Sequence, residues 1–268
     1  MMRRDTDSCS DPLRPRICSE SQYCVTGIVN NITTNGDFVK PQSCFAGFNC
    51  PPGSETPEGS GPCSPGFYCP VDSPAVLCPN ASYCEAGSTA PSPCKPGSYN
   101  NMTGQSACTP CAPGQVCPGY SRLQPEVCPA GSVCYSVGCA TPDTRCPRGS
   151  YCLAGTRTMT RNQPGGPQLC PAGTYCLDGV KQLETIDANF ETPQICKSGT
   201  YCGEGTDSQL GSGICPVGYY CPAGSASPTI ASAGSYASGK GNAFQSLCPP
   251  GSYAPLTGLY VAIPLEPY

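Results

Sequence analysis

Hydrophobic residues are scattered singly along this chain, with neither the spacing of an amphipathic helix nor the alternation of a long strand. The regular feature is a heptapeptide, CPAGTYC at 170–176, which recurs as CSPGFYC at 63–69, CPRGSYC at 146–152, CKSGTYC at 196–202 and CPVGYYC at 215–221. Close and looser copies, about 17 residues apart, begin at Cys18, Cys44, Cys63, Cys78, Cys94, Cys111, Cys128, Cys146, Cys170, Cys196, Cys215, Ala231 and Cys248. We number them repeats 1 to 13, and number the positions of each heptapeptide 1 to 7.

The residue types within a repeat predict two tight turns and two short extended pieces. Glycine at position 4 suits a turn with positive φ, and a second turn, Cys-x-x-Gly, begins at position 7 of many repeats. Tyrosine or valine at position 6 is expected to cover a neighbouring disulfide. The tyrosines expected to do so are Tyr68, Tyr83, Tyr99, Tyr151, Tyr175, Tyr201, Tyr220, Tyr236 and Tyr253. The predicted fold is small, disulfide-rich and mostly coil with short β-hairpins, in an elongated, solenoid-like tandem array.

Interruptions of the spacing suggest a division of the chain. The segments are 1–43, which contains cysteine; 44–155, tandem repeats; 156–195, repeats with longer insertions; 196–254, tandem repeats; and 255–268, a cysteine-free apolar tail. The charged insertion 180–194 could form a short helix or a domain joint. The tail is expected to form a strand, either donated to another subunit or domain, or belonging to a next domain of this chain, and Pro264 and Pro267 would limit it to an edge.

Composition explains how such a chain could hold together. Cysteine contributes 25 of 268 residues, glycine 32 and proline 33, whereas only 12 % are charged. This balance is typical of chains stapled by disulfides, and glycine and proline at this density exclude long helices. Since disulfides persist in oxidising compartments, we expect an extracellular or cell-surface location.

Several function classes are disfavoured by what the chain lacks. The formal net charge is −4 and we expect the 14 lysines and arginines to be dispersed apart from Arg3 and Arg4, which argues against nucleic acid as a partner. There is no histidine, so the usual catalytic sets and imidazole metal ligands are missing. We therefore predict a protein that is not an enzyme and holds no cofactor or metal.

Two candidate metal or redox sites are weighed against simpler explanations. The CTPC sequence of Cys108 and Cys111 could bind zinc or act in redox chemistry, but structural disulfides are preferred because no four-ligand set or helix N-terminus accompanies it. The acidic pairs Glu184 with Asp187 and Asp5 with Asp7 lack calcium-loop spacing and are expected to be solvated.

The beginning of the chain conflicts with its cysteine content. MMRRDTDSCSD has no apolar run of a secretion signal, and no stretch of about 18 apolar residues could span a membrane. The simplest expectation is a fragment, or a wrongly placed start, of a longer secreted or anchored protein.

Two disulfide schemes compete, and the odd number of cysteines leaves at least one thiol free or paired with another chain. In the first, each repeat closes on itself and Cys94 joins Cys108, which leaves Cys9, Cys139 and Cys248 over. In the second, position 7 of one repeat joins position 1 of the next. It pairs Cys9 with Cys18, Cys24 with Cys44, Cys50 with Cys63, Cys69 with Cys78, Cys84 with Cys94, Cys117 with Cys128, Cys134 with Cys146, Cys152 with Cys170, Cys176 with Cys196, Cys202 with Cys215, and Cys221 with Cys248, and leaves Cys108, Cys111 and Cys139 to place. The second is favoured because it explains why Ala231 and Ala237 can replace cysteines without leaving a partner over.

The motifs resemble two groups of extracellular repeats. CKPGSYNNMTGQSACTPC at 94–111, followed by APGQVC, resembles the cysteine-rich modules of the ephrin-receptor-like and TNF-receptor-like class. The commoner CPxGxYC form looks like cysteine-rich arrays of protist and algal surface glycoproteins, including components of flagellar hairs. Most repeats lack the Cys-x-x-Cys of the receptor type, which puts growth-factor binding in doubt.

These observations predict a structural or adhesive segment of an extracellular glycoprotein, a stiff disulfide-stapled rod in a filament or surface coat. The alternative is the ligand-binding ectodomain of a cell-surface receptor or transporter. Expected partners are other protein chains, including copies of this one, and glycans attached at the sequons of Asn31, Asn80 and Asn101.

Overall fold

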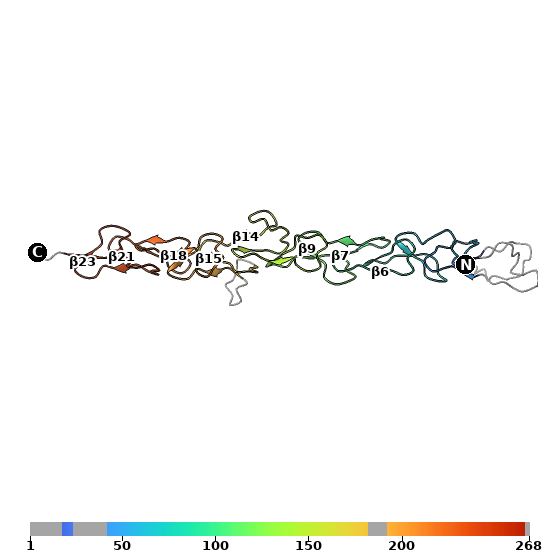
Figure 1. The fold of residues 1–268 in the computed structure, drawn as a ribbon, viewed down its shortest axis with the longest axis horizontal. Coiled ribbons are helices and arrows are strands. Elements are labelled where there is room, and N and C mark those ends of the chain that lie inside the picture. The colour runs from blue at the N-terminus through green and yellow to red at the C-terminus, as the bar shows by residue number, and fades with distance from the viewer. Residues whose placement is uncertain (1–17, 24–41, 182–191, 266–268) are drawn as a thin grey trace, which may run out of the picture. The chain divides into compact units, whose positions relative to one another are not determined.

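The structure, a computed structural model, describes residues 18–23, 42–181 and 192–265, and these residues contain no helix (Figure 1). They form 24 strands of two residues each, which pair in chain order as twelve two-stranded sheets. The strands are β1 Gln22–Tyr23, β2 Gln42–Ser43, β3 Phe67–Tyr68, β4 Val76–Leu77, β5 Ser82–Tyr83, β6 Ser92–Pro93, β7 Ser98–Tyr99, β8 Thr109–Pro110, β9 Gln115–Val116, β10 Glu126–Val127, β11 Ser132–Val133, β12 Thr144–Arg145, β13 Ser150–Tyr151, β14 Gln168–Leu169, β15 Thr174–Tyr175, β16 Gln194–Ile195, β17 Thr200–Tyr201, β18 Gly213–Ile214, β19 Tyr219–Tyr220, β20 Thr229–Ile230, β21 Ser235–Tyr236, β22 Ser246–Leu247, β23 Ser252–Tyr253 and β24 Ile263–Pro264. The predicted class, a disulfide-rich repeat of short hairpins and coil, is confirmed.

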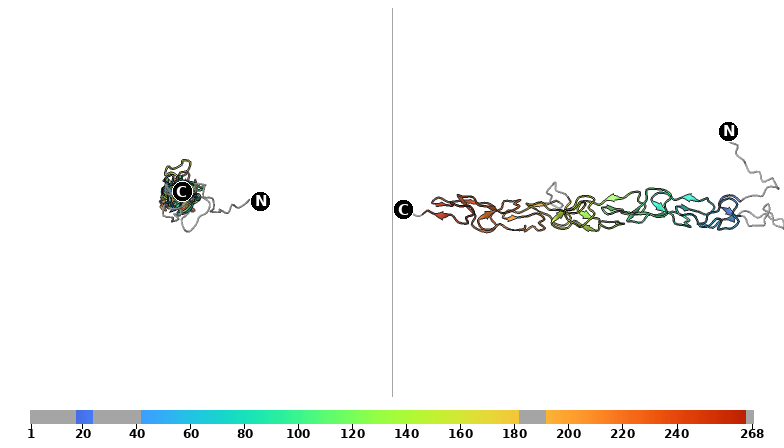
Figure 2. Two further views of the ribbon diagram at one scale, coloured as in Figure 1. Left: turned by 90° about the vertical axis from the view of Figure 1, so that its right-hand side faces the viewer. Right: turned by 90° about the horizontal axis from the view of Figure 1, so that it is seen from above.

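The chain divides into two compact units. The first comprises residues 1–109 and 119–124, and the second residues 110–118 and 125–268. Within each unit the hairpins follow one another in chain order (Figure 2). Nowhere in the described ranges is there a helix long and apolar enough to cross a membrane.

Each hairpin joins two consecutive repeats. Positions 5 and 6 of one repeat pair with the two residues that precede position 1 of the next, as Thr174 with Ile195 and Tyr175 with Gln194. The loop between them varies in length without changing this register. The insertions that interrupt the sequence spacing are therefore accommodated outside the paired residues.

Four backbone hydrogen bonds recur between consecutive repeats. For repeats 9 and 10 the N–H groups of Gly173, Cys196, Cys176 and Gly205 donate to the carbonyls of Cys202, Gly173, Thr206 and Cys170 respectively, with N···O distances of 2.7, 3.0, 3.0 and 2.8 Å. The same set joins repeats 10 and 11. Because only backbone groups take part, the contact tolerates many side chains at the remaining positions.

The glycine at position 4 is required for two reasons. Gly173 has a φ of +85°, which L side chains rarely adopt, and a Cβ built there would lie 2.5 Å from the carbonyl oxygen of Gly224 in repeat 11. The same contact between repeat n and repeat n+2 occurs for Gly47 with Gly87, Gly66 with Gly104, Gly114 with Gly155, Gly131 with Gly179, Gly149 with Gly205, Gly199 with Gly241 and Gly218 with Gly258. Each repeat therefore contacts both the next repeat and the one after it.

The small core consists of disulfides covered by position 6. Tyr175 is 5 % exposed and packs with Cys196 and Cys202 of the following repeat. Tyr151 packs in the same way against Cys170 and Cys176, and Val133 and Val116 cover the disulfides of repeats 8 and 7. The predicted role of position 6 is confirmed for these residues, and the disulfide covered is the one in the next repeat.

The structure contradicts the favoured disulfide scheme, because all ten disulfides between described cysteines close within a repeat. They are Cys44–Cys50, Cys63–Cys69, Cys78–Cys84, Cys94–Cys108, Cys111–Cys117, Cys128–Cys134, Cys146–Cys152, Cys170–Cys176, Cys196–Cys202 and Cys215–Cys221. Cys248 was expected to pair with Cys221 and is instead free. The first scheme is therefore the correct one for these cysteines.

The strand register explains why the second scheme fails. Cys196 lies opposite Gly173, whereas Cys176 lies three residues further along the same strand, which corresponds to roughly 10 Å. That separation exceeds the roughly 7 Å between Cα atoms that a disulfide can bridge. Within repeat 9, by contrast, the turn brings the Cα atoms of Cys170 and Cys176 to 5.8 Å.

Repeat 12 keeps its backbone arrangement without a disulfide. Ala231 and Ala237 are buried at positions 1 and 7, and the Gly218 N–H still donates to the Ala237 carbonyl at 3.0 Å. The Ala231 N–H donates to the Gly218 carbonyl at 2.9 Å. The backbone contacts are therefore sufficient to define the shape of a repeat.

The apolar tail pairs within its own chain. Strand β24, Ile263–Pro264, is antiparallel to β23, Ser252–Tyr253, in the register of the other hairpins. The Leu265 N–H donates to the Gly251 carbonyl at 2.8 Å, so Leu265 occupies the place of a position 1 residue. The prediction of a strand is confirmed, and its partner is the preceding repeat.

Candidate functional site

The surface of repeat 8 carries a group of arginines that the sequence analysis missed. Arg145, Arg148, Arg157 and Arg161 are all exposed and fall within about 17 residues, so the description of basic residues as dispersed is wrong here. Their closeness in the sequence was the signal that could have revealed them. Within the described ranges none of the four forms an ion pair with a carboxylate.

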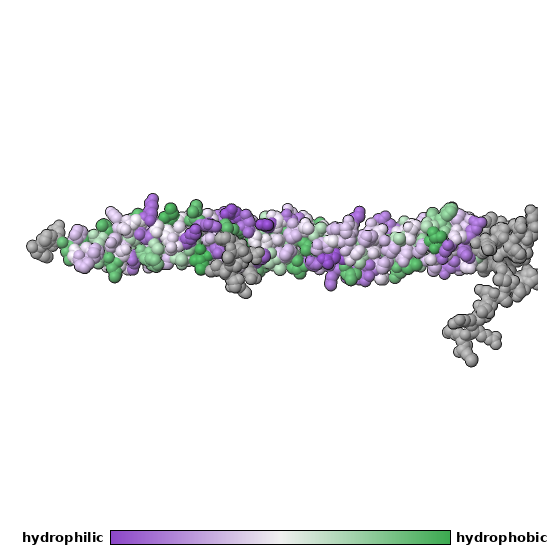
Figure 3. All heavy atoms as spheres, turned by 90° about the horizontal axis from the view of Figure 1, so that it is seen from below, coloured by the Kyte–Doolittle hydropathy of each residue, from purple (hydrophilic) through white to green (hydrophobic). Residues whose placement is uncertain are grey.

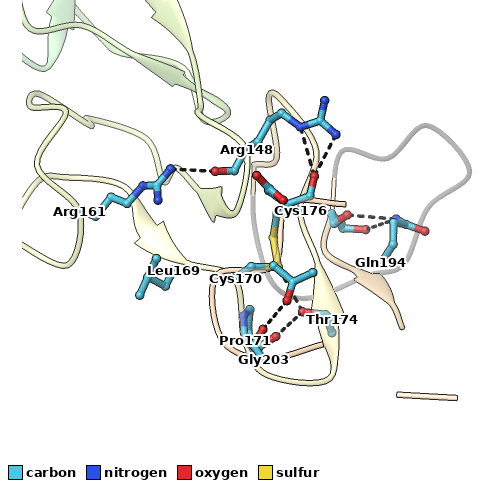
Figure 4. Close-up of a disulfide and its surroundings, with 12 residues drawn as sticks. Arg148, Arg161, Leu169, Cys170, Pro171, Thr174, Cys176, Gln194 and Gly203 are labelled. Atoms are coloured by element: carbon cyan, nitrogen blue, oxygen red, sulfur yellow. Dashed lines mark hydrogen bonds between the residues drawn. A yellow bond between two sulfur atoms is a disulfide. The ribbon is translucent and has the colours of Figure 1, made fainter. Parts of the chain in front are cut away.

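Hydrogen bonds to backbone carbonyls position two of these arginines. Arg161 Nη2 donates to the Arg148 carbonyl at 3.0 Å, and Arg148 donates through Nε and Nη2 to the Asp207 carbonyl at 3.1 and 2.9 Å (Figure 4). The Arg148 contact links repeat 8 to repeat 10 beside the Gly149–Gly205 contact. Figure 4 shows the two arginines joined in this way among the residues drawn around the Cys170–Cys176 disulfide of repeat 9.

A buried thiol, Cys139, lies beside the disulfide of repeat 7. It is 5 % exposed and packs with Val116, Cys128 and Cys134. Its Sγ donates to the Thr141 carbonyl at 2.6 Å and lies 3.7 Å from Asp143 Oδ2. Burial raises the pKa of Cys139, and the Asp143 charge raises it further, so the thiol is protonated and poorly reactive.

Asp143 caps the turn next to this thiol. Its Oδ2 accepts the N–H groups of Ser136 and Tyr135 at 2.9 and 2.7 Å. Burial acts to raise the pKa of Asp143, but these hydrogen bonds outweigh it and the pKa lies below its ordinary value. The carboxylate therefore stabilises the 135–143 loop in its charged form.

The second free thiol, Cys248, stands in a repeat that has lost half of its cysteine pair. Position 7 of repeat 13 is Ala254, which is buried, and Cys248 is half-buried. The Cys248 N–H still donates to the Gly234 carbonyl at 3.1 Å. A thiol here is accessible to reagents, unlike that of Cys139.

The candidate metal and redox sites are resolved by the disulfides. Cys108 bonds to Cys94 and Cys111 to Cys117, so CTPC holds no dithiol, and its interpretation as structural disulfides is confirmed. The described part of the chain contains no group of three or more Cys, Asp or Glu side chains arranged to hold a metal. Glu184, Asp187, Asp5 and Asp7 lie outside the described residues, as does the central part, 182–191, of the insertion expected to form a helix or joint.

Two of the three predicted glycosylation sites are described. Asn80, in the turn of repeat 4, and Asn101, in the loop of repeat 5, are both exposed. Asn31 lies outside the described residues. Asn100, the residue before Asn101, is only 4 % exposed and occupies position 7, which is cysteine in most repeats.

Exposed apolar residues are numerous but separated. The residue before position 1 is often an exposed aliphatic, as at Val127, Ile214 and Leu247, which are 63, 64 and 82 % exposed. On the face seen from below, hydrophobic side chains alternate with polar ones (Figure 3). This face presents no continuous apolar surface of the kind that marks a large protein interface.

No model of a known protein family matches this chain, and a search of curated proteins finds no similar sequence.

Proposed function

We propose that this chain is a structural or adhesive segment of an extracellular glycoprotein, in which disulfide-closed repeats stack into a stiff rod within a filament or surface coat. The observation that carries the proposal is the backbone contact set that recurs from repeat to repeat. The recurring glycine allows this backbone contact, the cysteines close each repeat, and the position 6 side chain covers the next disulfide. The regularly spaced residues of the chain are therefore those that build a scaffold.

Two further features support this proposal. Disulfides of this density are typical of proteins in oxidising compartments. The resemblance of the CPxGxYC repeats to surface glycoproteins of protists and algae points to the same class. Arrays in which each repeat contacts only near neighbours are suited to extended structures because they grow by adding repeats.

Electron microscopy of the purified, oxidised protein tests the proposal. We expect slender particles of uniform width that lose this form after reduction of the disulfides. A compact globule in the oxidised state would falsify the proposal.

A second candidate function, a ligand-binding ectodomain, is favoured by the arginines of repeat 8. Their exposed side chains would suit an anionic ligand on a scaffold whose remaining surface is mixed. A sulfated polysaccharide column distinguishes the candidates. If the arginines form a ligand site, replacing Arg148 and Arg161 by alanine should lower the salt concentration needed for elution, whereas replacing Lys197 and Lys240 should not.

A further inference from the structure

The sequons of Asn80 and Asn101 are brought together by one hydrogen bond. The Ala81 N–H donates to the Asn100 carbonyl at 2.8 Å, and these two peptide groups are the ones that Asn80 and Asn101 share with their neighbours. Covalent geometry therefore limits the distance between the Cα atoms of Asn80 and Asn101 to about 8 Å. Two acceptor sites that are 21 residues apart in the sequence are adjacent in the fold.

Asn100 contacts both sequons through its side chain. Its Nδ2 donates to the Ser82 carbonyl at 2.7 Å, and Ser82 is the hydroxyl residue of the first sequon. Its Oδ1 accepts the N–H of Met102, the middle residue of the second sequon, at 3.2 Å. A buried asparagine at a cysteine position thus fixes the two acceptor loops relative to each other.

Several departures from the repeat pattern lie at this place. Ala81 replaces the position 4 glycine and still has a φ of +60°, and Ser121, which has a φ of +55°, stands at the matching position two repeats ahead. Asn100 replaces a cysteine, so Cys94 pairs with Cys108 instead and encloses the second sequon in a longer loop. Both acceptor asparagines remain exposed at the surface of this irregular region.

We propose that Asn80 and Asn101 are a pair of adjacent N-glycosylation sites whose two glycans contact each other, and that Asn100 is the residue that positions the pair. This inference rests on the proposed extracellular location. N-linked glycans are bulky and attach at exposed loops, so two glycans whose Cα atoms are this close must crowd each other. Each should hinder the trimming enzymes that process its neighbour.

The test uses the whole chain secreted from cultured eukaryotic cells behind an added signal peptide. Glycopeptide mass spectrometry should find glycans at both asparagines. Ser82→Ala and Thr103→Ala each remove one sequon while leaving both asparagines and the hydrogen bonds of Asn100 in place. Removing the glycan at Asn80 with Ser82→Ala should lower the untrimmed, oligomannose fraction at Asn101 at least twofold, and Thr103→Ala should do the same at Asn80.

The role of Asn100 has its own readout and control. Asn100→Ala should leave both sites occupied but reduce this mutual effect. Gln105→Ala, in the same loop, should leave the effect unchanged, because the Gln105 side chain donates to the Thr103 carbonyl and its backbone carbonyl, which accepts the Cys84 N–H, is kept in the variant. An empty sequon in the disulfide-bonded secreted protein, or processing at Asn101 that ignores Ser82→Ala, would overturn the inference. Neither of these glycan results changes the particle shape seen by electron microscopy. Failure of this inference can therefore be distinguished from failure of the proposed function.

Discussion

Repeats 9 and 12 have nearly the same backbone contacts and very different chemistry. In repeat 9, Cys170 and Cys176 are joined by a disulfide, whereas repeat 12 has Ala231 and Ala237 at the same positions. Both keep a position 4 glycine with positive φ and the hydrogen bonds to the preceding repeat. The glycine and the backbone bonds therefore define the shape, and the disulfide adds stability to a shape already defined.

The two repeats also differ in what lies against the glycine. The Cα of Gly173 faces the Gly224 carbonyl two repeats ahead, whereas nothing lies within 4 Å of a Cβ built on Gly234. The pair thus separates two requirements on position 4 that act together at Gly173, the positive-φ turn and the close approach of another repeat.

The largest effect is expected for Gly173→Ala compared with Gly234→Ala. Both variants place an L side chain at positive φ, at a cost of about 1 to 2 kcal/mol. Only Gly173→Ala also forces a methyl group against a backbone carbonyl, so we expect a total loss of about 2 to 5 kcal/mol there. Hydrogen exchange of the Cys196 and Gly224 amides measures the difference, and equal effects at both glycines would refute the contact between repeats n and n+2.

Removing the disulfide of repeat 9 should convert it into a second repeat 12. Cys170→Ala with Cys176→Ala should cost about 2 to 3 kcal/mol, because the short loop is released in the unfolded chain. The β15–β16 hairpin should persist, with the Cys196 amide still protected from exchange. Loss of that protection would mean that the disulfide is needed for the shape itself.

The reverse substitution, which adds a disulfide to repeat 12, should stabilise that repeat by up to about 2 kcal/mol. Ala231→Cys with Ala237→Cys should form a disulfide spontaneously, because the hydrogen bonds of these two residues match those of Cys170 and Cys176. The increase in melting temperature and an unchanged number of free thiols provide the measurement. The single variant Ala231→Cys serves as the control, since it should add one reactive thiol and no stability.

The smallest effects concern the two free thiols. Cys248 should react with a maleimide at least tenfold faster than Cys139, which is buried and has a raised pKa. A raised pKa means that the neutral thiol of Cys139 stabilises the fold below its ordinary pKa, and that this contribution is lost as the pH rises through the raised value. Asp143→Asn removes the neighbouring charge and should speed labelling of Cys139 but not of Cys248; equal rates for the two thiols in the native chain would contradict the assignment.

Asp143 has the opposite dependence on pH. Its lowered pKa gives a contribution that is present above the ordinary carboxyl pKa and is lost as the pH falls through the lowered value. In Asp143→Asn, the protection factors of the Tyr135 and Ser136 amides, which correct for the pH dependence of intrinsic exchange, should no longer change across that acid range.

Much of this fold could be predicted because residues close together in the sequence of each repeat determine its local geometry. Gly173 and Tyr175 are two residues apart in the sequence, and their roles, a positive-φ turn and a covering ring, depend mainly on that spacing. The disulfide partner of Cys176 could not be predicted in this way, because it depends on which residue of the next repeat lies opposite Gly173. Both pairing schemes fit the same cysteine spacing, and only the register excludes one.

The contact between repeats n and n+2 left a signal that was not recognised. Ala81 in repeat 4 replaces a position 4 glycine, and its counterpart two repeats ahead, Ser121, also replaces a glycine. Ser21 of repeat 1 and Asp72 of repeat 3 show the same joint replacement, again with positive φ. The adjacency of the Asn80 and Asn101 sequons was likewise hidden, because it depends on a hydrogen bond between repeats.

Closure of every described disulfide within its own repeat determines what happens when the chain is cut. Cleavage after Arg161, in the exposed loop of repeat 8, leaves Cys146–Cys152 on one fragment and Cys170–Cys176 on the other. The two fragments are then held by noncovalent contacts, among them the β13–β14 pairing, the Arg148–Asp207 hydrogen bonds and the packing of Tyr151 against the Cys170–Cys176 disulfide. A nicked molecule should migrate as one particle under native conditions and separate into two pieces in detergent without any reducing agent, so its integrity after proteolysis depends on noncovalent contacts alone.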